Sequence, residues 1–284
     1  MELYDPQTIR FIKKKYGFRF SKSLGQNFLV SRDAVDGIVE GAGIGPEDFV
    51  LEIGPGIGVL TQAACARAKL VKAVEIDRQL IEVLGFTLAL EKNVEIVEGD
   101  VLKLDLKALI PEGTPRDRVK IIGNLPYYIT TPILMKVLES DLPAASVTVM
   151  MQKEVAERII SPPGSRIYGA LSVAVQYRAE TTLVEEVPRD LFMPAPKVDS
   201  AVLRMDLLAE PKVRPVDEKL FFRVVRAGFS QRRKTLLNAL SNGGFPKDEV
   251  REAMEAAGIE PNRRAETLGL EEFQALADQF AREA

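Results

Sequence analysis

The sequence predicts an α/β fold of the Rossmann-like kind, in which helices cover a mostly parallel sheet, followed by a smaller all-α domain. Short apolar strand patterns alternate with helical patterns from residue 48 to residue 161. A glycine-rich turn follows the first of these strands, and each pattern after residue 219 is helical. Strands that alternate with helices are typical of βαβ units and therefore of a parallel sheet.

The elements follow one another in a regular order. Residues 1–45 are expected to form helices and turns, with Ser31 as the N-cap of a helix over 31–44. Apolar strand patterns cover residues 48–53, 70–77, 93–100, 120–123 and 146–152. Helical patterns follow them at residues 59–68, 78–91, 130–140 and 153–161.

A different composition begins at residue 168. Residues 168–207 are rich in β-branched and aromatic residues without a long helical pattern, so we expect two or three antiparallel strands at the sheet edge. A proline-containing linker then leads to helical patterns at 220–230, 233–242, 247–259 and 270–283. With a boundary near 209–216, we expect one domain over 1–210, including a basic helical segment at 1–45, and a helical C-terminal domain over 211–284.

The composition excludes several classes of chemistry. The 284 residues include one cysteine, Cys65, and no histidine. This excludes an intrachain disulfide, a cysteine-ligated zinc site and nucleophilic systems that use a histidine base. The sequence has no charge-free apolar run of membrane-spanning length and no signal-peptide core. We therefore expect a cytoplasmic, monomeric protein without a metal and without a membrane partner.

Two basic segments contrast with a net charge of −3. Residues 10–22 hold six basic residues and no acidic one, and residues 212–234 hold eight basic and two acidic residues. Either segment alone is typical of a solvated helix face. Because aromatic residues are interleaved with the charges in both segments, we interpret them as surfaces for a polyanion.

A glycine-rich turn with acidic residues around it indicates a nucleotide-like ligand. The G-P-G-I-G turn at residues 54–58 lies between a strand and a helix, where glycines let the backbone approach a ligand. Its spacing after Glu52 differs from the dinucleotide pattern G-x-G-x-x-G and is typical of S-adenosylmethionine sites. Later strands end in Glu75 and Asp100, which can bind the ribose hydroxyls and the adenine amine of that cofactor. Each acid alone is more typical of a turn residue, and the glycine sequence alone also fits a tight turn between strand and helix, but the three features in this order on successive strands favour a ligand site.

The next strand ends at the same edge in Asn124-Leu125-Pro126-Tyr127-Tyr128. An amide or backbone oxygen there can accept from the amino group of an adenine, and Pro126 has no N–H that would compete. Tyr127 offers a face for an extruded base, whereas we expect Tyr128 to pack. Methyl transfer to such an amine needs positioning rather than a strong base, which fits the absence of histidine. The alternative for this stretch alone is a turn over an aromatic cluster.

Several long motifs resemble one family. They are S-L-G-Q-N-F-L, L-E-I-G-P-G-I-G-V-L-T, G-N-L-P-Y-Y-I-T-T-P-I-L, F-M-P-A-P-K-V-D-S-A-V-L and G-F-S-Q-R-R-K-T-L-L-N-A-L. From Lys22 to the C-terminal helices the chain resembles the KsgA/RsmA family of small-subunit (16S) rRNA adenine dimethyltransferases. The resemblance implies a class I S-adenosylmethionine-dependent methyltransferase fold. It also implies dimethylation of N6 on two adjacent adenines in the 3′-terminal hairpin loop of 16S rRNA, within the assembling small ribosomal subunit.

Motif matching assigns residues to these roles. The cofactor would contact Gln26, Asn27, Leu29, Gly54, Gly56, Glu75, Ile76, Asp100, Val101 and Asn124. The catalytic residues would be Asn124, Leu125, Pro126, Tyr127 and Phe192, with Phe192 as the second face of a stack around the target base. Among the basic residues, Arg223, Arg226, Arg232, Arg233 and Lys234 would face RNA phosphates, or some would pair with the acidic C-terminal helices.

Other interpretations stay open. The related Erm-type 23S rRNA adenine dimethyltransferases usually carry N-I-P-Y followed by a Ser-Thr pair, whereas Leu125 and the T-T-P-I-L that follows favour the small-subunit type. Leu125 also departs from the [DN]-P-P-[YFW] pattern of DNA adenine methyltransferases. A non-catalytic RNA-binding assembly factor would show damaged cofactor or N-L-P-Y residues, and none is visible.

Overall fold

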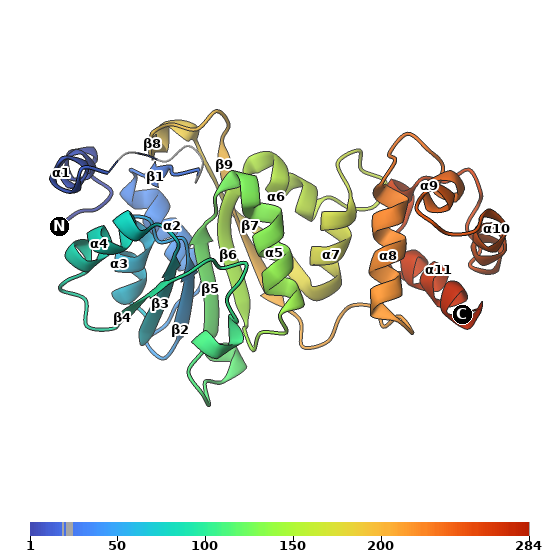
Figure 1. Ribbon diagram of the computed structural model, residues 1–284, viewed down its shortest axis with the longest axis horizontal. Coiled ribbons are helices and arrows are strands. Elements are labelled where there is room, and N and C mark those ends of the chain that lie inside the picture. Colours follow the sequence, from blue (N-terminus) through green and yellow to red (C-terminus); the bar gives the residue numbers. More distant parts are fainter. Residues whose placement is uncertain (19, 21–24, 284) are drawn as a thin grey trace. The chain divides into compact units, whose positions relative to one another are not determined.

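The computed structural model describes residues 1–18, 20 and 25–283 (Figure 1). Two basic residues of the first basic segment, Arg19 and Lys22, and the start of the S-L-G-Q-N-F-L motif lie outside the described residues. The chain divides into two compact units. The first is formed by Met1–Ala156 and Thr181–Leu207, and the second by Glu157–Glu180 and the residues from Leu208 onward. The expected division at residue 210 differs from these units in two segments, residues 157–180 and residues 208–210, which both belong to the second unit.

The first unit contains a seven-stranded sheet in the order β4-β3-β2-β5-β6-β9-β7. Its strands are β2 (Phe49–Ile53), β3 (Leu70–Glu75), β4 (Val94–Glu98), β5 (Val119–Asn124), β6 (Ser146–Gln152), β7 (Ala179–Val187) and β9 (Ser200–Leu207). Strands β4, β3, β2, β5 and β6 are parallel, and β9 is antiparallel to β6. The predicted α/β fold with antiparallel strands at one edge is therefore confirmed.

The order of the strands reverses between β2 and β5, which is where a ligand crevice is expected in such a sheet. From β2 the chain continues to β3 and β4 on one side and then returns to β5 on the other side. Ligands of open α/β sheets bind at the carboxyl ends of the strands at such a reversal. All five residues of β2 are buried, as expected for a parallel strand with both faces covered.

Helices and short strands complete the first unit. They are α1 (Pro6–Tyr16), α2 (Arg32–Gly41), α3 (Val59–Cys65), α4 (Arg78–Thr87), α5 (Thr130–Glu139), α6 (Lys153–Ile160), β1 (Phe28–Leu29) and β8 (Phe192–Met193), with 3₁₀ turns η1 (Lys107–Leu109), η2 (Arg116–Arg118), η3 (Tyr127–Ile129) and η4 (Arg189–Leu191). Helix α6 continues into the second unit. Ser31 caps α2 by accepting from the Ala34 N–H at 3.3 Å, as predicted. Strands β1 and β8 pair with each other apart from the large sheet.

The prediction of strands throughout 168–207 is wrong in its first part. Ala170–Arg178 forms helix α7, and most of its residues are buried, including Val173, Val175 and Tyr177. A helix that is buried on nearly all sides has no polar stripe, so its sequence lacks the usual helical periodicity. Valine favours strands by propensity, and tertiary packing overrides that propensity in α7.

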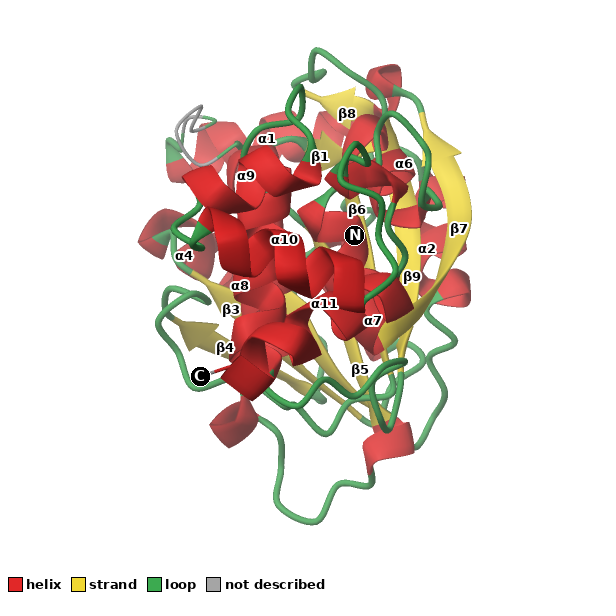
Figure 2. Ribbon diagram, turned by 90° about the vertical axis from the view of Figure 1, so that its right-hand side faces the viewer, coloured by secondary structure: helices red, strands yellow, loops and turns green. Residues whose placement is uncertain are grey.

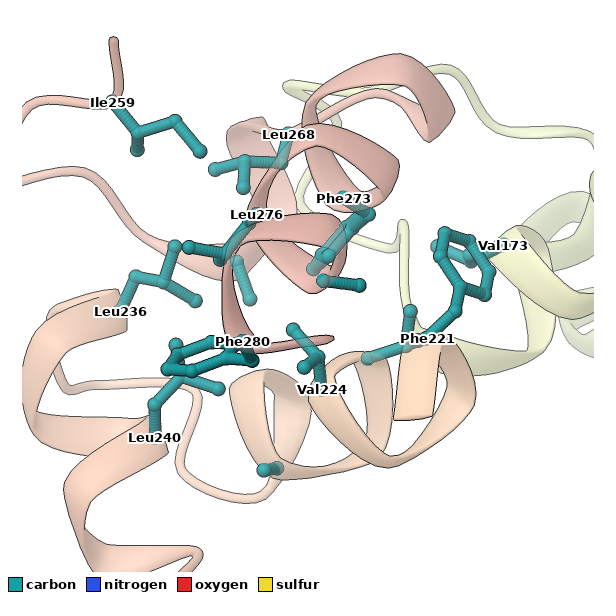
Figure 3. Close-up of a cluster of buried hydrophobic side chains, with 14 of the residues drawn as sticks. Val173, Phe221, Val224, Leu236, Leu240, Ile259, Leu268, Phe273, Leu276 and Phe280 are labelled. Atoms are coloured by element: carbon teal, nitrogen blue, oxygen red, sulfur yellow. The ribbon is translucent and has the colours of Figure 1, made fainter. Parts of the chain in front are cut away.

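The second unit is helical, apart from the first residues of β7. It holds α7 and then α8 (Glu218–Phe229), α9 (Leu236–Asn242), α10 (Lys247–Ala256), the turn η5 (Ala265–Thr267) and α11 (Leu270–Glu283). Helices α8 to α11 lie together (Figure 2). Their buried faces form one apolar core around Phe221, Phe273 and Leu276, which also includes Val173 of α7 (Figure 3). In the part of the chain that the structure describes, no helix has both the length and the apolarity to cross a membrane.

Candidate functional site

A cavity of about 280 Å³ lies at the carboxyl ends of the parallel strands, where the strand order reverses. Residues 25–29 and the ends of β2, β3, β4 and β5 line it. The lining includes all the predicted cofactor residues and four of the predicted catalytic residues, namely Gln26, Asn27, Leu29, Gly54, Gly56, Glu75, Ile76, Asp100, Val101, Asn124, Leu125, Pro126 and Tyr127. Segments that are far apart in the sequence therefore meet at one site in the first unit.

The glycine turn lets the backbone approach the cavity. Gly54 and Gly56 have φ angles of +71° and +61°, a backbone conformation that residues other than glycine rarely adopt. A Cβ atom on Gly56 would also lie 2.9 Å from Cε1 of Phe28, which is too close for a real contact. The Gly56 N–H donates to Oε2 of Glu75 at 3.2 Å. Both glycines are therefore required by conformation, and Gly56 also by space.

Glu75 is fixed at the end of β3 by backbone donors. Its Oε1 accepts from the N–H groups of Ile76 and Asp77, each at 2.9 Å. Burial raises the pKa of Glu75, and the hydrogen bonds from the backbone oppose that effect. Ile76, which follows it, is 51% exposed although it lines the cavity. Glu75 thus presents a polar contact to a ligand, and Ile76 presents an apolar one.

Glu52 is the most deeply buried acid of the cavity. Its side chain is 1% exposed, and its Oε2 has no hydrogen-bond partner among the described residues. Burial, the main cause, and the charge of Glu75 raise the pKa of Glu52 to about 8, and the neighbouring Thr61 hydroxyl opposes that effect. A buried carboxylate without a partner is costly, so this position favours a donor or a cation from a ligand.

The third acid lies beyond β4. Asp100 accepts from the Leu102 N–H at 3.0 Å through Oδ1, and its Oδ2 lies 3.5 Å from Nζ of Lys103. Three acidic side chains thus face a cavity whose lining, as far as the described residues define it, contains no lysine or arginine. This arrangement suits a ligand that carries positive charge and several hydroxyl or amino donors.

Asn124 ends β5 with its amide orientation fixed. Its Nδ2 donates to the carbonyl oxygen of Asn27 at 3.0 Å, and its Oδ1 has no partner among the residues that the structure describes. The carbonyl of Pro126 accepts from the Ile129 N–H and from Oγ1 of Thr130, both at 3.1 Å. The Pro126 carbonyl, one of the backbone oxygens predicted to hold the target amine, is therefore already bonded by residues that follow it, whereas Oδ1 of Asn124 is an acceptor without a partner among the described residues.

The two tyrosines differ, but not as predicted. Oη of Tyr127 lies 2.6 Å from Oγ of Ser200 at the start of β9, and burial raises the pKa of this tyrosine. Its ring is half-buried and lines the cavity. Tyr128 was expected to pack, which is wrong, because it is 56% exposed and lies beside Gly25 at the cavity.

Phe192 is not brought to the cavity. It pairs with Leu29 in the β1–β8 strands, is 4% exposed and belongs to an apolar cluster that includes Phe28 and Ile57. In this structure its ring faces protein rather than the space beside Tyr127. Phe192 thus lies next to residues that line the cavity, but neither face of its ring is open to a ligand.

The five basic residues predicted to face phosphates are all exposed and lie on α8 and the turn after it. Arg223 stacks on Phe245 with its Cζ 4.5 Å from the ring centroid, and Arg232 donates to the Arg166 carbonyl. None of the five pairs with an acidic side chain in the described part of the chain, so the expected alternative of pairing with the acidic helices is not observed.

Sequence reasoning missed several residues of the site. Gly25, Phe28, Leu80, Leu102 and Met150 line the cavity beside the predicted residues. Their apolar character resembles that of any core residue, so periodicity alone could not assign them to a ligand. Ser200 was missed because its contact with Tyr127 joins residues 73 positions apart.

Comparisons with known proteins agree on one family. The model of the family described as "Ribosomal RNA adenine dimethylase" matches residues 17–282. A relative from Alkaliphilus oremlandii named "Ribosomal RNA small subunit methyltransferase A" is 51% identical over 279 residues, which are 98% of this chain and 97% of the relative. A relative of the same name from Geobacillus thermodenitrificans is 48% identical over 98% of this chain and 96% of its own length.

Solved structures also resemble the chain. A dimethyladenosine transferase from Plasmodium falciparum is 27% identical, with a TM-score of 0.73, over 90% of this chain and 98% of its own. The 23S rRNA methyltransferase ErmE is 30% identical, with a TM-score of 0.67, over 89% of this chain and 99% of its own. Both similarities extend over nearly the whole chain.

Proposed function

The chain belongs to the ribosomal RNA adenine dimethylase family, and from that premise we propose that it dimethylates N6 of two adjacent adenines in the 3′-terminal hairpin loop of 16S rRNA. The methyl donor is S-adenosylmethionine, and the substrate is the assembling small ribosomal subunit. The observation that carries the proposal is a single cavity that joins the glycine turn and its acids to the N-L-P-Y loop. We expect the enzyme to act as a monomer in the cytoplasm, where its ribosomal substrate is assembled.

The residues of the cavity fit the cofactor. Glu75 and Asp100 would accept from its ribose hydroxyls and adenine amine, with Ile76 and Val101 against the adenine ring. The unpartnered Oε2 of Glu52 would face the cationic part of the cofactor, and the absence of side chains at Gly54 and Gly56 would leave room for this part. Gln26, Asn27 and Leu29 would cover the bound molecule, since they line the same cavity. When bound, the cofactor supplies a methyl group activated by a sulfonium.

The N-L-P-Y loop would hold the target adenine. The amino nitrogen of adenine is a weak nucleophile because its lone pair is delocalised into the ring. Oδ1 of Asn124 would accept from this amino group and hold it in a pyramidal geometry that frees the lone pair. The Asn27 carbonyl fixes the amide so that the oxygen, and not the nitrogen, is available to the substrate. The proton can leave after transfer, so the site needs no histidine.

The base would be extruded from the RNA and stacked. Tyr127 lines the cavity beside Asn124, and Ser200 fixes the position of its ring. Leu125, 1% exposed, would act through its backbone and its packing rather than through contact with the base. Phe192 would serve as the second stacking face only after its ring leaves the apolar cluster that covers it in this structure.

The docking of the RNA would use the second unit. Arg223, Arg226, Arg232, Arg233 and Lys234 are exposed and lack acidic partners among the described residues, so their charge is available to phosphates. A net charge of −3 for the whole chain means that this local cluster, rather than the overall charge, would attract the RNA.

The small subunit is favoured over the large one by sequence similarity. The relative from Alkaliphilus oremlandii, 51% identical, carries a small-subunit name, whereas the 23S enzyme ErmE is 30% identical. The test is transfer of radiolabelled methyl groups to small subunits that lack the modification, compared with large-subunit rRNA, followed by nucleoside analysis. Label in N6,N6-dimethyladenosine of 16S rRNA is expected. Label only in 23S rRNA would support the Erm-type activity, and no label in either would support a non-catalytic assembly factor.

A further inference from the structure

Residues 10–16 of the first basic segment lie in helix α1, which has one exposed face that the proposed docking does not use. Helix α1 contains four basic residues and no acidic residue. Its buried side carries Ile9 and Ile12, which pack into the core of the first unit. Gln7, Arg10, Phe11 and Lys14 are all exposed, and their spacing of three and four residues places them on the opposite face.

The four cations of α1 divide into two pairs. Lys13 lies 4.5 Å from the ring centroid of Phe20, and Lys15 lies 3.4 Å from that of Phe86, so both are held against the protein by aromatic rings. Arg10 and Lys14 make no ion pair or hydrogen bond with another described residue. Beside them Phe11 is 53% exposed, although it is a large apolar side chain.

We propose that this face, made of Gln7, Arg10, Phe11 and Lys14, is a second contact for the RNA substrate, separate from the basic residues of the second unit. The inference rests on the proposed function. Two exposed cations beside an exposed ring match the way proteins bind single-stranded RNA, with phosphates on the cations and a base on the ring. The occupant is therefore a single-stranded segment of the rRNA beside the target loop.

Other occupants fit the face less well. An amphipathic helix that binds a membrane keeps its apolar side free, whereas Ile9 and Ile12 are buried here and only Phe11 is open. The face is also linked to the active site through packing, because the cluster that holds Ile9 and Ile12 includes Phe28, Leu29 and Leu80, which line the cavity. RNA held by α1 would thus keep a fixed relation to the N-L-P-Y loop.

The role of the charges on this face is tested with the double variant Arg10→Ala/Lys14→Ala, and the double variant Lys92→Ala/Lys107→Ala is the control. The control removes two exposed lysines of the same unit that lack ion pairs within the described residues. Affinity for unmethylated small subunits is measured over a series of salt concentrations. The slope of log K against log salt should decrease in magnitude by about 1.4 for the first variant, since each phosphate on a single strand contributes about 0.7. Equal slopes for both double variants would overturn the proposal.

The ring is tested separately with Phe11→Ala, Phe11→Leu and Phe11→Trp. Loss of a stacked base should weaken binding about fivefold or more in the alanine and leucine variants at every salt concentration, while tryptophan retains it. Leucine that binds as well as tryptophan would contradict stacking. Circular dichroism and thermal unfolding identify any variant in which α1 has lost its structure.

Two further results separate the alternatives. Binding of the chain to vesicles with anionic lipids tests a membrane as the alternative occupant. If the Arg10→Ala/Lys14→Ala variant no longer binds the vesicles, while its salt dependence of binding to small subunits equals that of the wild type, the face binds lipid and not RNA. Methyl transfer by the wild-type chain tests the proposed function itself. If the wild type methylates small subunits but the slope of the α1 variant is unchanged, only the inference about α1 fails.

Discussion

Nδ2 of Asn124 donates to the carbonyl oxygen of Asn27 at 3.0 Å, which joins the end of β5 to the segment that leads into β1. The two residues are 97 positions apart, and both line the cavity. One hydrogen bond thus connects a segment expected to cover the cofactor with the loop expected to hold the target base. The contact also determines which atom of the Asn124 amide remains free.

Replacing Asn124 by alanine should reduce single-turnover methyl transfer by at least about a hundredfold, because the acceptor that positions the amine is lost. Affinity for small subunits should stay within about twofold of the wild type. Affinity for the cofactor should fall modestly, since Asn27 loses one hydrogen bond of about 1 kcal/mol. Rapid-quench kinetics and filter binding measure these effects. A large loss of RNA binding would show that Asn124 has a different role.

Replacing Glu52 by glutamine should change how stability depends on pH. The pKa of Glu52 is raised to about 8 in the folded chain, so the folded state holds this proton more tightly than the unfolded state. The wild type therefore loses stability as pH rises from about 4.5 to 8, by on the order of 4 kcal/mol, and the variant does not. Urea unfolding of both chains between pH 5 and 8 should give a difference that increases with pH. A difference independent of pH would contradict this assignment.

The same substitution should weaken cofactor binding. The ionised carboxylate favours a cation in the cavity, so wild-type affinity should increase as pH rises toward 8, whereas the affinity of Glu52→Gln should be lower and nearly constant. Titration calorimetry at several pH values measures both. If the wild type and Glu52→Gln bind the cofactor with equal affinity at pH 8, the cationic part of the cofactor does not lie beside Glu52.

Tyr127 and Ser200 should act as a unit. Tyr127→Phe and Ser200→Ala each remove the 2.6 Å hydrogen bond but keep the ring, so each should slow methyl transfer by about threefold to tenfold. The double variant should be no slower than either single variant, because the same contact is lost. RNA with 2-aminopurine at the target position reports stacking by quenched fluorescence, which Tyr127→Ala should abolish. Additive effects would indicate that the two residues act independently.

The cations after α8 should contribute electrostatic affinity. Arg232→Ala/Arg233→Ala/Lys234→Ala removes three exposed charges, and the slope of log K against log salt should decrease in magnitude by two to three. Methyl transfer at saturating RNA should change little, because these residues lie outside the unit that forms the cavity. An unchanged slope would remove this cluster from the RNA interface.

The sheet, the glycine turn with its acids and the C-terminal helices could be predicted because each depends on a local pattern, whereas Ile76, Val101 and Leu125 were assigned only through the resemblance to a family. Strand ends with acids and a glycine turn identify one edge of a parallel sheet without knowledge of contacts. Helix α7 was missed because burial on nearly all sides removes the periodicity that identifies a helix. The Tyr127–Ser200 contact, the exposure of Tyr128 and the burial of Phe192 depend on how distant segments pack, which spacing along one chain does not encode.

Gly123 lies in β5 next to Asn124, and its lack of a side chain is required by space. A Cβ atom there would lie 2.6 Å from the backbone oxygen of Ile53 at the end of β2. Gly123→Ala should therefore push β5 away from β2, destabilise the chain by at least about 2 kcal/mol and slow methyl transfer through displacement of Asn124.

Gly85 provides the matched control for this last substitution. It lies in α4, is exposed, and a Cβ atom added to it would meet no atom within 4 Å. Gly85→Ala should stabilise the chain by about 0.5 to 1 kcal/mol, because alanine loses less backbone freedom in a helix. Urea unfolding and methyl transfer are measured for both variants. A Gly123→Ala chain as stable and active as the wild type would mean that β2 and β5 can separate at their carboxyl ends without moving the N-L-P-Y loop.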